Sequence, residues 1–188
     1  MAEIKVDQTV DAKGLSCPMP IVRTKKAIEQ LEPGKVIEVQ ATDKGSKPDI
    51  QGWAKSTGHQ YLGTIEEGDV LKHYIRKSDP KDIHPEQKFP HVVSNTELRQ
   101  KLGDDQVTVV DVREPAEYAF AHIPQSLSIP YGELADRLDE LNKDDHIYVI
   151  CRTGRRSDYC CHLLAENGFK KVYNVIPGMS EWNGPIEK

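Results

Sequence analysis

The sequence has no run of about 18 apolar residues and no apolar segment at its N-terminus, so it predicts neither a membrane span nor a secretory signal. It also has only four cysteines and no C-x-x-C pair, with Cys17 and Cys151 far apart and Cys160 and Cys161 adjacent. This spacing argues against a disulfide scaffold and against a zinc site. We therefore expect free thiols, no metal, and a location in the reducing cytoplasm.

The sequence also has fewer basic than acidic residues, with 25 Lys and Arg against 30 Asp and Glu, which gives a net charge of -5. The acidic excess lies in residues 80–188, while residues 1–79 are balanced. An acidic chain is a poor match for nonspecific binding to nucleic acid, whose phosphates attract cations. We expect no direct nucleic-acid partner and no membrane partner.

Residues 78–90 show little periodicity of apolar residues and contain Pro80, Pro85 and Pro90. Proline-rich segments of this kind form semi-rigid linkers. The 188 residues are enough for two small domains that each bury a core. We therefore predict a first domain over residues 1–78, a linker over residues 79–90 and a second domain over residues 91–188.

The apolar pattern differs between the two predicted domains. In the first, a helix is expected to end near Leu31, followed by a strand at residues 36–39 and a short helix at residues 47–58. Residues 59–65 and 70–75 are expected to form a hairpin. In the second, strands and helices alternate over residues 107–112, 115–121, 126–129, 133–141, 147–150, 157–166 and 172–175. Such alternation predicts an α/β domain with a largely parallel sheet.

The most informative motif is the run Val149-Ile150-Cys151-Arg152-Thr153-Gly154-Arg155-Arg156-Ser157. A short apolar strand leads Cys151 into a loop with one glycine and three arginines, and a helix follows. Loop amides, the helix dipole and guanidinium groups all favour a thiolate, which is the nucleophilic form of cysteine. Cys151 is therefore a candidate for covalent catalysis. The plain alternative is a buried cysteine beside a basic surface loop.

The length of this loop decides what it can hold. In a cysteine phosphatase the loop wraps around a tetrahedral phosphate, and its arginine stands where this chain has Ser157; here the last arginine, Arg156, comes one residue earlier. A tighter loop surrounds less volume and suits a single sulfur atom, because amides aimed at one point stabilise an anionic persulfide. The spacing favours sulfur chemistry, with a phosphatase or arsenate-reducing relative as the disfavoured alternative.

Residues from about 91 to 186 resemble a rhodanese domain. Besides the Cys151 loop, they contain four motifs in the family's order: Val109-Val110-Asp111-Val112-Arg113, Glu117-Tyr118, Ala121-His122-Ile123-Pro124 and Gly178-Met179-Ser180-Glu181-Trp182. The resemblance implies sulfur transfer through a persulfide on Cys151, with the loop amides and Arg156 holding the sulfur. The residues implied in substrate binding are Arg152, Thr153, Gly154, Arg155 and Arg156. Asp111 and Arg113 are expected to brace the loops as a buried ion pair.

The chain departs from the rhodanese pattern at two places. Ala121 stands before His122 where the family often has glycine, and Gln125-Ser126 follow the proline. Some members that prefer thiosulfate carry a lysine at the position that Thr153 occupies here. The sulfur donor therefore stays open among thiosulfate, a polysulfide and a low-molecular-weight persulfide.

A second cysteine motif lies in the first domain, where Cys17-Pro18-Met19-Pro20 precedes the helical pattern. Pro18 and Pro20 fit the first turn of a helix, where missing amide protons cost nothing. Cys17 is thus expected at a helix N-terminus, where a thiolate is favoured. The plain alternative is a small residue that caps the helix.

Residues from about 4 to 77 resemble a TusA/SirA-like domain. The hallmark is this Cys-Pro-x-Pro motif preceded by Gly14-Leu15, and Asp43, Asp49-Ile50 and Tyr74-Ile75-Arg76-Lys77 also match the family's pattern. The resemblance implies a two-layer α/β sandwich in which Cys17 receives a persulfide and passes it on. Other members of the family act as regulatory or binding modules.

Together the two resemblances predict a sulfurtransferase of α/β class, with a TusA-like sandwich followed by a rhodanese-like domain with a parallel sheet. We expect Cys151 to carry sulfane sulfur and to relay it to or from Cys17, without a cofactor other than the covalent persulfide. The expected partners are a sulfane-sulfur donor and an acceptor thiol or sulfur-acceptor protein. The alternative is a rhodanese whose N-terminal domain is a non-catalytic module for partner binding or regulation.

Overall fold

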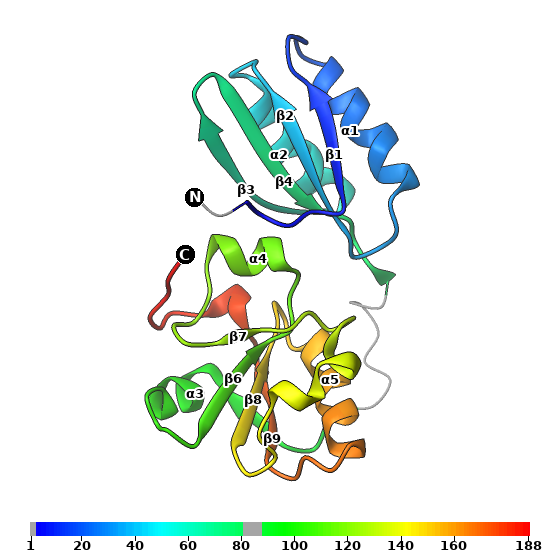
Figure 1. The fold of residues 1–188 in the computed structure, drawn as a ribbon. Helices are drawn as coiled ribbons and strands as arrows, with labels where there is room; N and C mark the ends of the chain where they lie inside the picture. Colours follow the sequence, from blue (N-terminus) through cyan, green and yellow to red (C-terminus); the bar gives the residue numbers. More distant parts are fainter. Residues whose placement is uncertain (1–2, 81–87) are drawn as a thin grey trace. The chain divides into compact units, whose positions relative to one another are not determined.

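The computed structural model describes residues 3–80 and 88–188, and the chain divides into two compact units, residues 1–81 and 82–188 (Figure 1). The expected linker, residues 79–90, falls mainly on residues 81–87, which lie outside the described residues. At its two ends Asp79 is buried and Phe89 belongs to the core of the second unit. Packing therefore continues past residue 78 and begins before residue 91.

The first unit consists of a four-stranded sheet and two helices. Its elements are β1 (Gln8–Ala12), α1 (Met19–Gln30), β2 (Val36–Ala41), α2 (Ser46–Thr57), β3 (Gln60–Glu67) and β4 (Val70–Arg76). The strand order is β1-β2-β4-β3, in which β1 and β2 are parallel and the other pairs are antiparallel. This is the two-layer α/β sandwich that the sequence predicts.

The core of the first unit lies between the helices and one face of the sheet. Successive strand residues point to opposite faces, so Val10, Ile37 and Ile75 share the face on which Ile28 of α1 and Ile50 of α2 pack. The strand β1 is not evident in the sequence, because its short run of alternating residues buries only Val10 and Ala12. The strand matters for the site, since the loop that follows it contains Cys17.

The second unit has a five-stranded sheet in which every neighbouring pair is parallel, as the alternation of strands and helices predicts. The strand order is β5-β9-β8-β6-β7. The elements are β5 (Val92–Ser94), α3 (Asn95–Lys101), β6 (Val107–Asp111), α4 (Pro115–Phe120), β7 (Leu127–Ser128), β8 (His146–Ile150), α5 (Arg155–Glu166) and β9 (Val172–Ile176).

Both faces of the central strands of this sheet are buried. Val110 and Val149 pack with Leu164 of α5 on one face, while Val109 and Tyr148 pack with Leu98 of α3 on the other. A parallel strand that is covered on both faces needs a nearly continuous apolar run, and residues 147–150 supply one. The strand β8 that leads to Cys151 therefore lies at the centre of the domain.

Three segments of the second unit differ from the sequence prediction. Residues 133–141 form two single 3-10 turns, Leu134–Asp136 and Leu138–Glu140, instead of one helix, because Arg137 between them has a φ of -122° that a helix does not allow. The other two segments, β5 and α3, were not predicted. Ser94 and Glu97 form a capping box that starts α3.

Candidate active sites at Cys151 and Cys17

Cys151 follows the last residue of β8, which lies between β9 and β6 in the sheet. The carboxyl ends of parallel strands are where folds of this class place their ligands. The loop of residues 151–154 then leads directly into α5, as the sequence predicts (Figure 1). The thiol of Cys151 is buried, with 1% of the residue exposed.

Four hydrogen bonds form a closed ring that includes the sulfur of Cys151. The amide of Gly154 donates to Cys151 Sγ at 3.1 Å, and Sγ lies 3.2 Å from Ser157 Oγ. Ser157 Oγ in turn donates to Asn174 Oδ1 at 2.6 Å, and Asn174 Nδ2 donates to the carbonyl oxygen of Gly154 at 3.0 Å. The ring fixes the loop, the first turn of α5 and strand β9 around one sulfur atom.

A glycine is required at the turn from this loop into α5. Gly154 has a φ of +93°, in the left-handed region that favours glycine. A Cβ atom at this position would meet Ile176 Cγ2 at 2.6 Å, well inside van der Waals contact. The side chain of any other residue would therefore push the Gly154 amide away from Cys151 Sγ.

The segment after β9 holds the backbone of the Cys151 loop. The amides of Met179 and Ser180 donate to the carbonyl oxygens of Cys151 and Arg152 at 2.8 and 2.9 Å. Gly178 is itself held by the side-chain amide of Asn95, which donates to its carbonyl oxygen and accepts from its amide. The Gly178-Met179-Ser180 motif thus positions the loop.

The guanidinium of Arg156 binds a carboxylate, which corrects the expectation that it holds the sulfur. Its Nη1 and Nη2 atoms donate to the two carboxylate oxygens of Glu117 at 2.8 and 3.0 Å, and both residues are buried. A bidentate pair of this kind ties α5 to α4. Arg152, Thr153 and Arg155 differ from Arg156 because their side chains are exposed at the rim of the loop.

Asp111 and Arg113, at the end of β6, form the buried ion pair that the sequence analysis expects. Arg113 Nη2 lies 2.6 Å from Asp111 Oδ2 and also donates to the carbonyl oxygen of Ala121 at 2.8 Å. The pair joins the end of β6 to the segment after α4. It therefore braces the same end of the sheet as the Cys151 loop.

The adjacent cysteines of α5 belong to the core. Cys160 and Cys161 are both fully buried and pack in the cluster that contains Val149 and Leu164. Burial raises the pKa of both thiols above the ordinary cysteine value. Their structural role was the favoured interpretation of the sequence, although only one of the two was expected to face the core.

Cys17 lies in the loop between β1 and α1, and it is exposed. Its backbone amide donates to Asp43 Oδ2 at 3.0 Å, in the loop after β2. Pro18 is the N-cap of α1 and Pro20 lies in the first turn, so both prolines are placed as the sequence predicts. The Cys17 loop therefore meets the segment that leads from β2 into α2.

The thiol of Cys17 donates a hydrogen bond to Asp49 Oδ2 at 2.7 Å. This bond favours the protonated thiol, and together with slight burial and the charges of Asp49 and Asp43 it raises the pKa of Cys17 above the ordinary cysteine value. This corrects the expectation that Cys17 favours the thiolate, because the hydrogen bond to Asp49 and the charges of the two carboxylates favour the protonated thiol.

Several residues of the two sites were not assigned a role from the sequence. In the sequence, Asp49 and Glu117 stand out only as parts of family motifs, and no motif contains Asn174. The available signal for Asn174 is a polar residue inside the apolar strand Val172–Ile176, because a buried amide must find hydrogen-bond partners. The partner of Arg156 is 39 residues away in sequence, so no local pattern indicates it.

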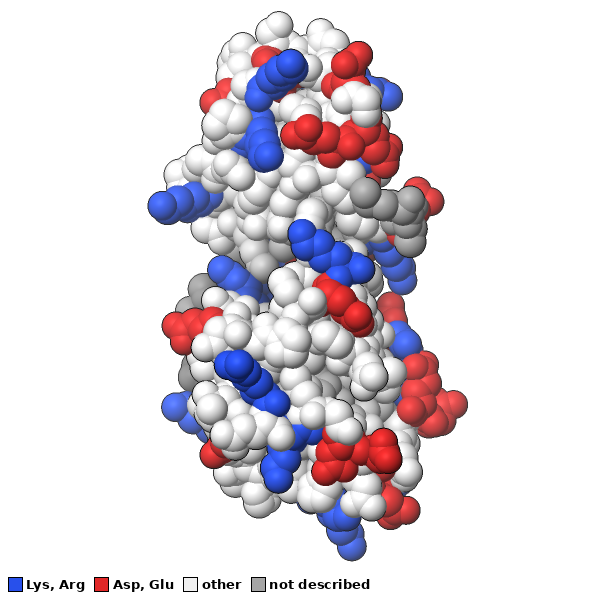
Figure 2. Space-filling view, turned by 90° about the vertical axis from the view of Figure 1, so that its left-hand side faces the viewer, with Lys and Arg blue, Asp and Glu red and all other residues white. Residues whose placement is uncertain are grey.

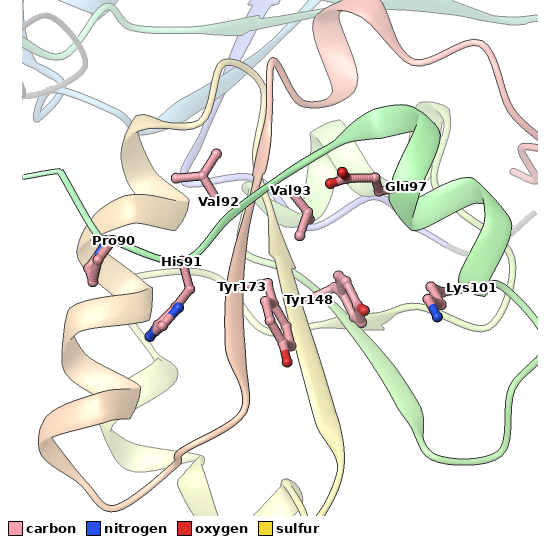
Figure 3. A pocket seen from close by; sticks show the side chains of 8 residues that line it. All are labelled: Pro90, His91, Val92, Val93, Glu97, Lys101, Tyr148 and Tyr173. Carbon is pink, nitrogen blue, oxygen red and sulfur yellow. The ribbon is translucent and has the colours of Figure 1, made fainter.

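A surface pocket of about 470 Å³ lies at the edge strand β5 (Figure 3). Tyr148 and Tyr173 stack with ring centroids 4.9 Å apart and form its aromatic wall, and Glu97 and Lys101 of α3 lie at its side. The residues that line it do not include Cys151 or its loop. The pocket is therefore separate from the sulfur of the candidate active site.

Charged side chains of both signs are visible on the face drawn in Figure 2. On the face drawn in Figure 2, basic and acidic side chains alternate with uncharged surface, and neither sign forms one continuous field. Within residues 3–80 and 88–188, no helix is long and apolar enough to cross a membrane.

Comparison with known families assigns the two units. Residues 8–77 match the family "Sulfurtransferase TusA", and residues 94–185 match the family "Rhodanese-like domain". Each match contains the cysteine motif of its unit.

Two of the relatives match this chain over its whole length, and a third matches the first unit. The protein named "Putative sulfur carrier protein YrkF" of Bacillus subtilis is 48% identical over 98% of this chain and 100% of its own length. A protein of Aquifex aeolicus named "Putative sulfur carrier protein" is 40% identical over 100% of this chain and 92% of its own length. The sulfur carrier protein TusA of Allochromatium vinosum is 44% identical over 38% of this chain and 95% of its own length. The chain belongs to the family of sulfur carrier proteins in which a TusA domain is fused to a rhodanese-like domain.

Proposed function

We propose that this chain is a sulfurtransferase that carries sulfane sulfur as a persulfide on Cys151 and relays it to or from Cys17. The observation that supports this most directly is the geometry around Cys151, whose sulfur accepts the amide of Gly154 at the mouth of a helix. A sulfur that accepts a loop amide at the N-terminus of a helix suits a covalent persulfide, because these groups stabilise negative charge on sulfur. No cofactor enters the proposed reaction.

In the first step Cys151 attacks the sulfane sulfur of thiosulfate, a polysulfide or a low-molecular-weight persulfide. A bond forms between Cys151 Sγ and the sulfane sulfur, and the bond from that sulfur to the rest of the donor breaks. The electron pair of the broken bond leaves with the donor, as sulfite or as a thiolate. The amide of Gly154 and the N-terminus of α5 favour the negative charge on sulfur during this exchange.

The rim of the loop supports an anionic donor. Arg152 and Arg155 are exposed there beside Thr153, while the guanidinium of Arg156 binds Glu117 inside the domain. Exposed arginines on an otherwise acidic domain concentrate small anions near the sulfur. We assign Arg152, Thr153, Gly154 and Arg155 to substrate binding and Arg156 to positioning of the loop.

In the second step an acceptor thiol attacks the outer sulfur of the persulfide, and Cys151 leaves as the thiolate. We assign this role to Cys17, of the same chain or of a second copy, because its thiol is exposed and stands in the Cys-Pro-x-Pro motif of a TusA domain. Transfer in the reverse direction uses the same bonds. An external thiol or a sulfur-acceptor protein then takes the sulfur away.

Intact-protein mass spectrometry tests the relay. Wild type, Cys151→Ser and Cys17→Ser are exposed briefly to thiosulfate or polysulfide, and the mass gain of one sulfur is mapped to each cysteine. We expect Cys151 to be labelled in Cys17→Ser, and Cys17 to be labelled by thiosulfate only when Cys151 is present. Labelling confined to Cys151 in wild type would leave a rhodanese with a recognition domain, and no labelling of Cys151 by any donor would overturn the proposed chemistry.

A further inference from the structure

We propose that Asp49 is the general base of Cys17, which takes the thiol proton as Cys17 attacks a persulfide. This inference rests on the sulfur-accepting role of Cys17 proposed above. It assigns a chemical role to a carboxylate that lies on a different element from the cysteine, in the first turn of α2.

The geometry is that of a thiol paired with a base. Cys17 Sγ lies 2.7 Å from Asp49 Oδ2, and the thiol is the donor. General base catalysis requires this kind of hydrogen-bond reach between the base and the proton that it removes.

A base is needed at this position because the free thiolate is scarce. The hydrogen bond to Asp49 raises the pKa of Cys17, so at neutral pH the thiol form dominates. Attack through a preformed thiolate would therefore slow about tenfold for each unit by which the pH falls. A thiol that passes its proton to a bonded carboxylate during attack does not depend on that small fraction.

The atoms of the step balance. Cys17 Sγ forms a bond to the outer sulfur of a neutral persulfide, and the bond between the two persulfide sulfurs breaks with its electron pair on the inner sulfur. The thiol proton moves from Sγ to Asp49 Oδ2, because Sγ loses its affinity for the proton as the new bond forms. The products are the Cys17 persulfide, the donor thiolate and a protonated Asp49, which returns its proton to water.

The charged groups that act on the Cys17 thiol are Asp49 from α2 and Asp43 from the loop after β2. Asp43 binds the backbone amides of Cys17 and Gly45, whereas Asp49 binds the sulfur. The two carboxylates therefore separate two roles. Asp43 positions the loop, and Asp49 contacts the reacting atom.

The test follows sulfur acceptance by Cys17 as a function of pH. The full chain with Cys151→Ser, in which Cys160 and Cys161 are buried, is mixed with glutathione persulfide, and intact mass spectrometry measures the rate of sulfur gain. The same rate is measured after Asp49→Asn. The rate with Asp49 is divided by the rate with Asn at this position, so that the titration of the donor cancels. Between about pH 8 and pH 6 we expect this quotient to rise about tenfold for each unit that the pH falls.

Two control variants separate the chemistry from structural effects. Asp43→Asn removes a nearby charge without touching the sulfur, so it is expected to keep the pH dependence of the parent chain even if its rate changes. Asp49→Glu retains a carboxylate and is expected to restore part of that pH dependence, which shows that a loss in Asp49→Asn does not come from misfolding. A ratio that stays constant with pH, or Asp43→Asn behaving like Asp49→Asn, would overturn the role of Asp49.

Alkylation of Cys17 by iodoacetamide distinguishes failure of this inference from failure of the proposed function. If Cys17 gains sulfur with the same pH dependence with and without Asp49→Asn, the sulfur-accepting role of Cys17 stands and the role of Asp49 as its base is wrong. If Cys17 gains no sulfur but its alkylation rate depends on Asp49 and pH as described, the proton transfer stands and the sulfur-accepting role is wrong.

Discussion

Cys151 Sγ lies 3.2 Å from Ser157 Oγ, and the hydroxyl proton of Ser157 is donated away from it, to Asn174. The orientation of the Asn174 amide is fixed because its Nδ2 atom donates to the carbonyl oxygen of Gly154. In this arrangement Ser157 can only accept from the Cys151 thiol. When the sulfur becomes anionic, the hydroxyl must turn toward it and give up its bond to Asn174.

This relationship predicts that substitutions of Asn174 and Ser157 have different effects on the reactivity of Cys151. Asn174→Ala releases the Ser157 hydroxyl to donate to the sulfur, which favours the thiolate, so alkylation of Cys151 by iodoacetamide at neutral pH should become several-fold faster. Ser157→Ala removes the hydroxyl and should not accelerate alkylation. Each substitution also breaks buried hydrogen bonds and should lower the free energy of unfolding by about 1–3 kcal/mol. Equal alkylation rates in the two variants would contradict the argument.

The buried pair of Arg156 and Glu117 predicts a large loss of stability when one partner is neutralised. Glu117→Gln leaves the guanidinium buried without its countercharge, which costs about 3–5 kcal/mol of unfolding free energy. Urea denaturation followed by circular dichroism measures this cost. The matched control is Glu140→Gln, which removes an exposed partner of Arg137 and should cost at most about 1 kcal/mol.

Substitution of Gly154 by alanine is expected to reduce sulfur loading of Cys151, whereas the same substitution of Gly58 is not. Gly154→Ala places a Cβ against Ile176 and moves the amide that binds the sulfur, so persulfide formation on Cys151 should fall about tenfold or more. Gly58 has a comparable φ of +81°, but a Cβ there meets nothing within 4 Å. Gly58→Ala should therefore cost stability alone, about 1 kcal/mol or somewhat more, and leave loading unchanged.

The buried His73 is expected to make the stability of the first unit fall at acidic pH. It is buried between Ser46 and Thr64, and burial, with a smaller contribution from Lys47, lowers the pKa of His73 to about 4. Below about pH 6.5 the unfolded chain binds a proton that the folded chain refuses, so stability falls as pH decreases from about 6.5 to 4.

The contribution of His73 to this slope is at most about 1.4 kcal/mol per pH unit. Urea denaturation at several pH values, followed by circular dichroism, measures the slope. His73→Gln should lower the stability at pH 7 and flatten the slope between these pH values. An unchanged slope would assign the pH dependence to other groups.

The sequence predicts the parts of the sites that depend on local order. The strand before Cys151, the glycine turn and the helix after it are contiguous, and the prolines after Cys17 mark the start of α1. The alternation of strands and helices along the second half of the chain likewise predicts the parallel sheet. These features follow from residues within one or two helical turns of each other.

The sequence does not predict which distant groups meet at the two sites. The partner of Cys17 is 32 residues away and the partner of Arg156 is 39 residues away, and both meetings are set by tertiary packing. Motif reasoning therefore gave Arg156 to the sulfur and favoured a Cys17 thiolate. The position of Cys17 at a helix N-terminus does not reveal the acidic residues that act on it, because these come from another loop and another helix.

The cysteine pair on α5 has a practical consequence. Cys160 and Cys161 are enclosed in the core of the second unit, whereas Cys17 is exposed. A maleimide reagent added to the native protein can reach the two core thiols only when α5 leaves the sheet. Their slow labelling would therefore count the openings of the rhodanese-like domain, so the unmodified chain contains its own reporter of unfolding.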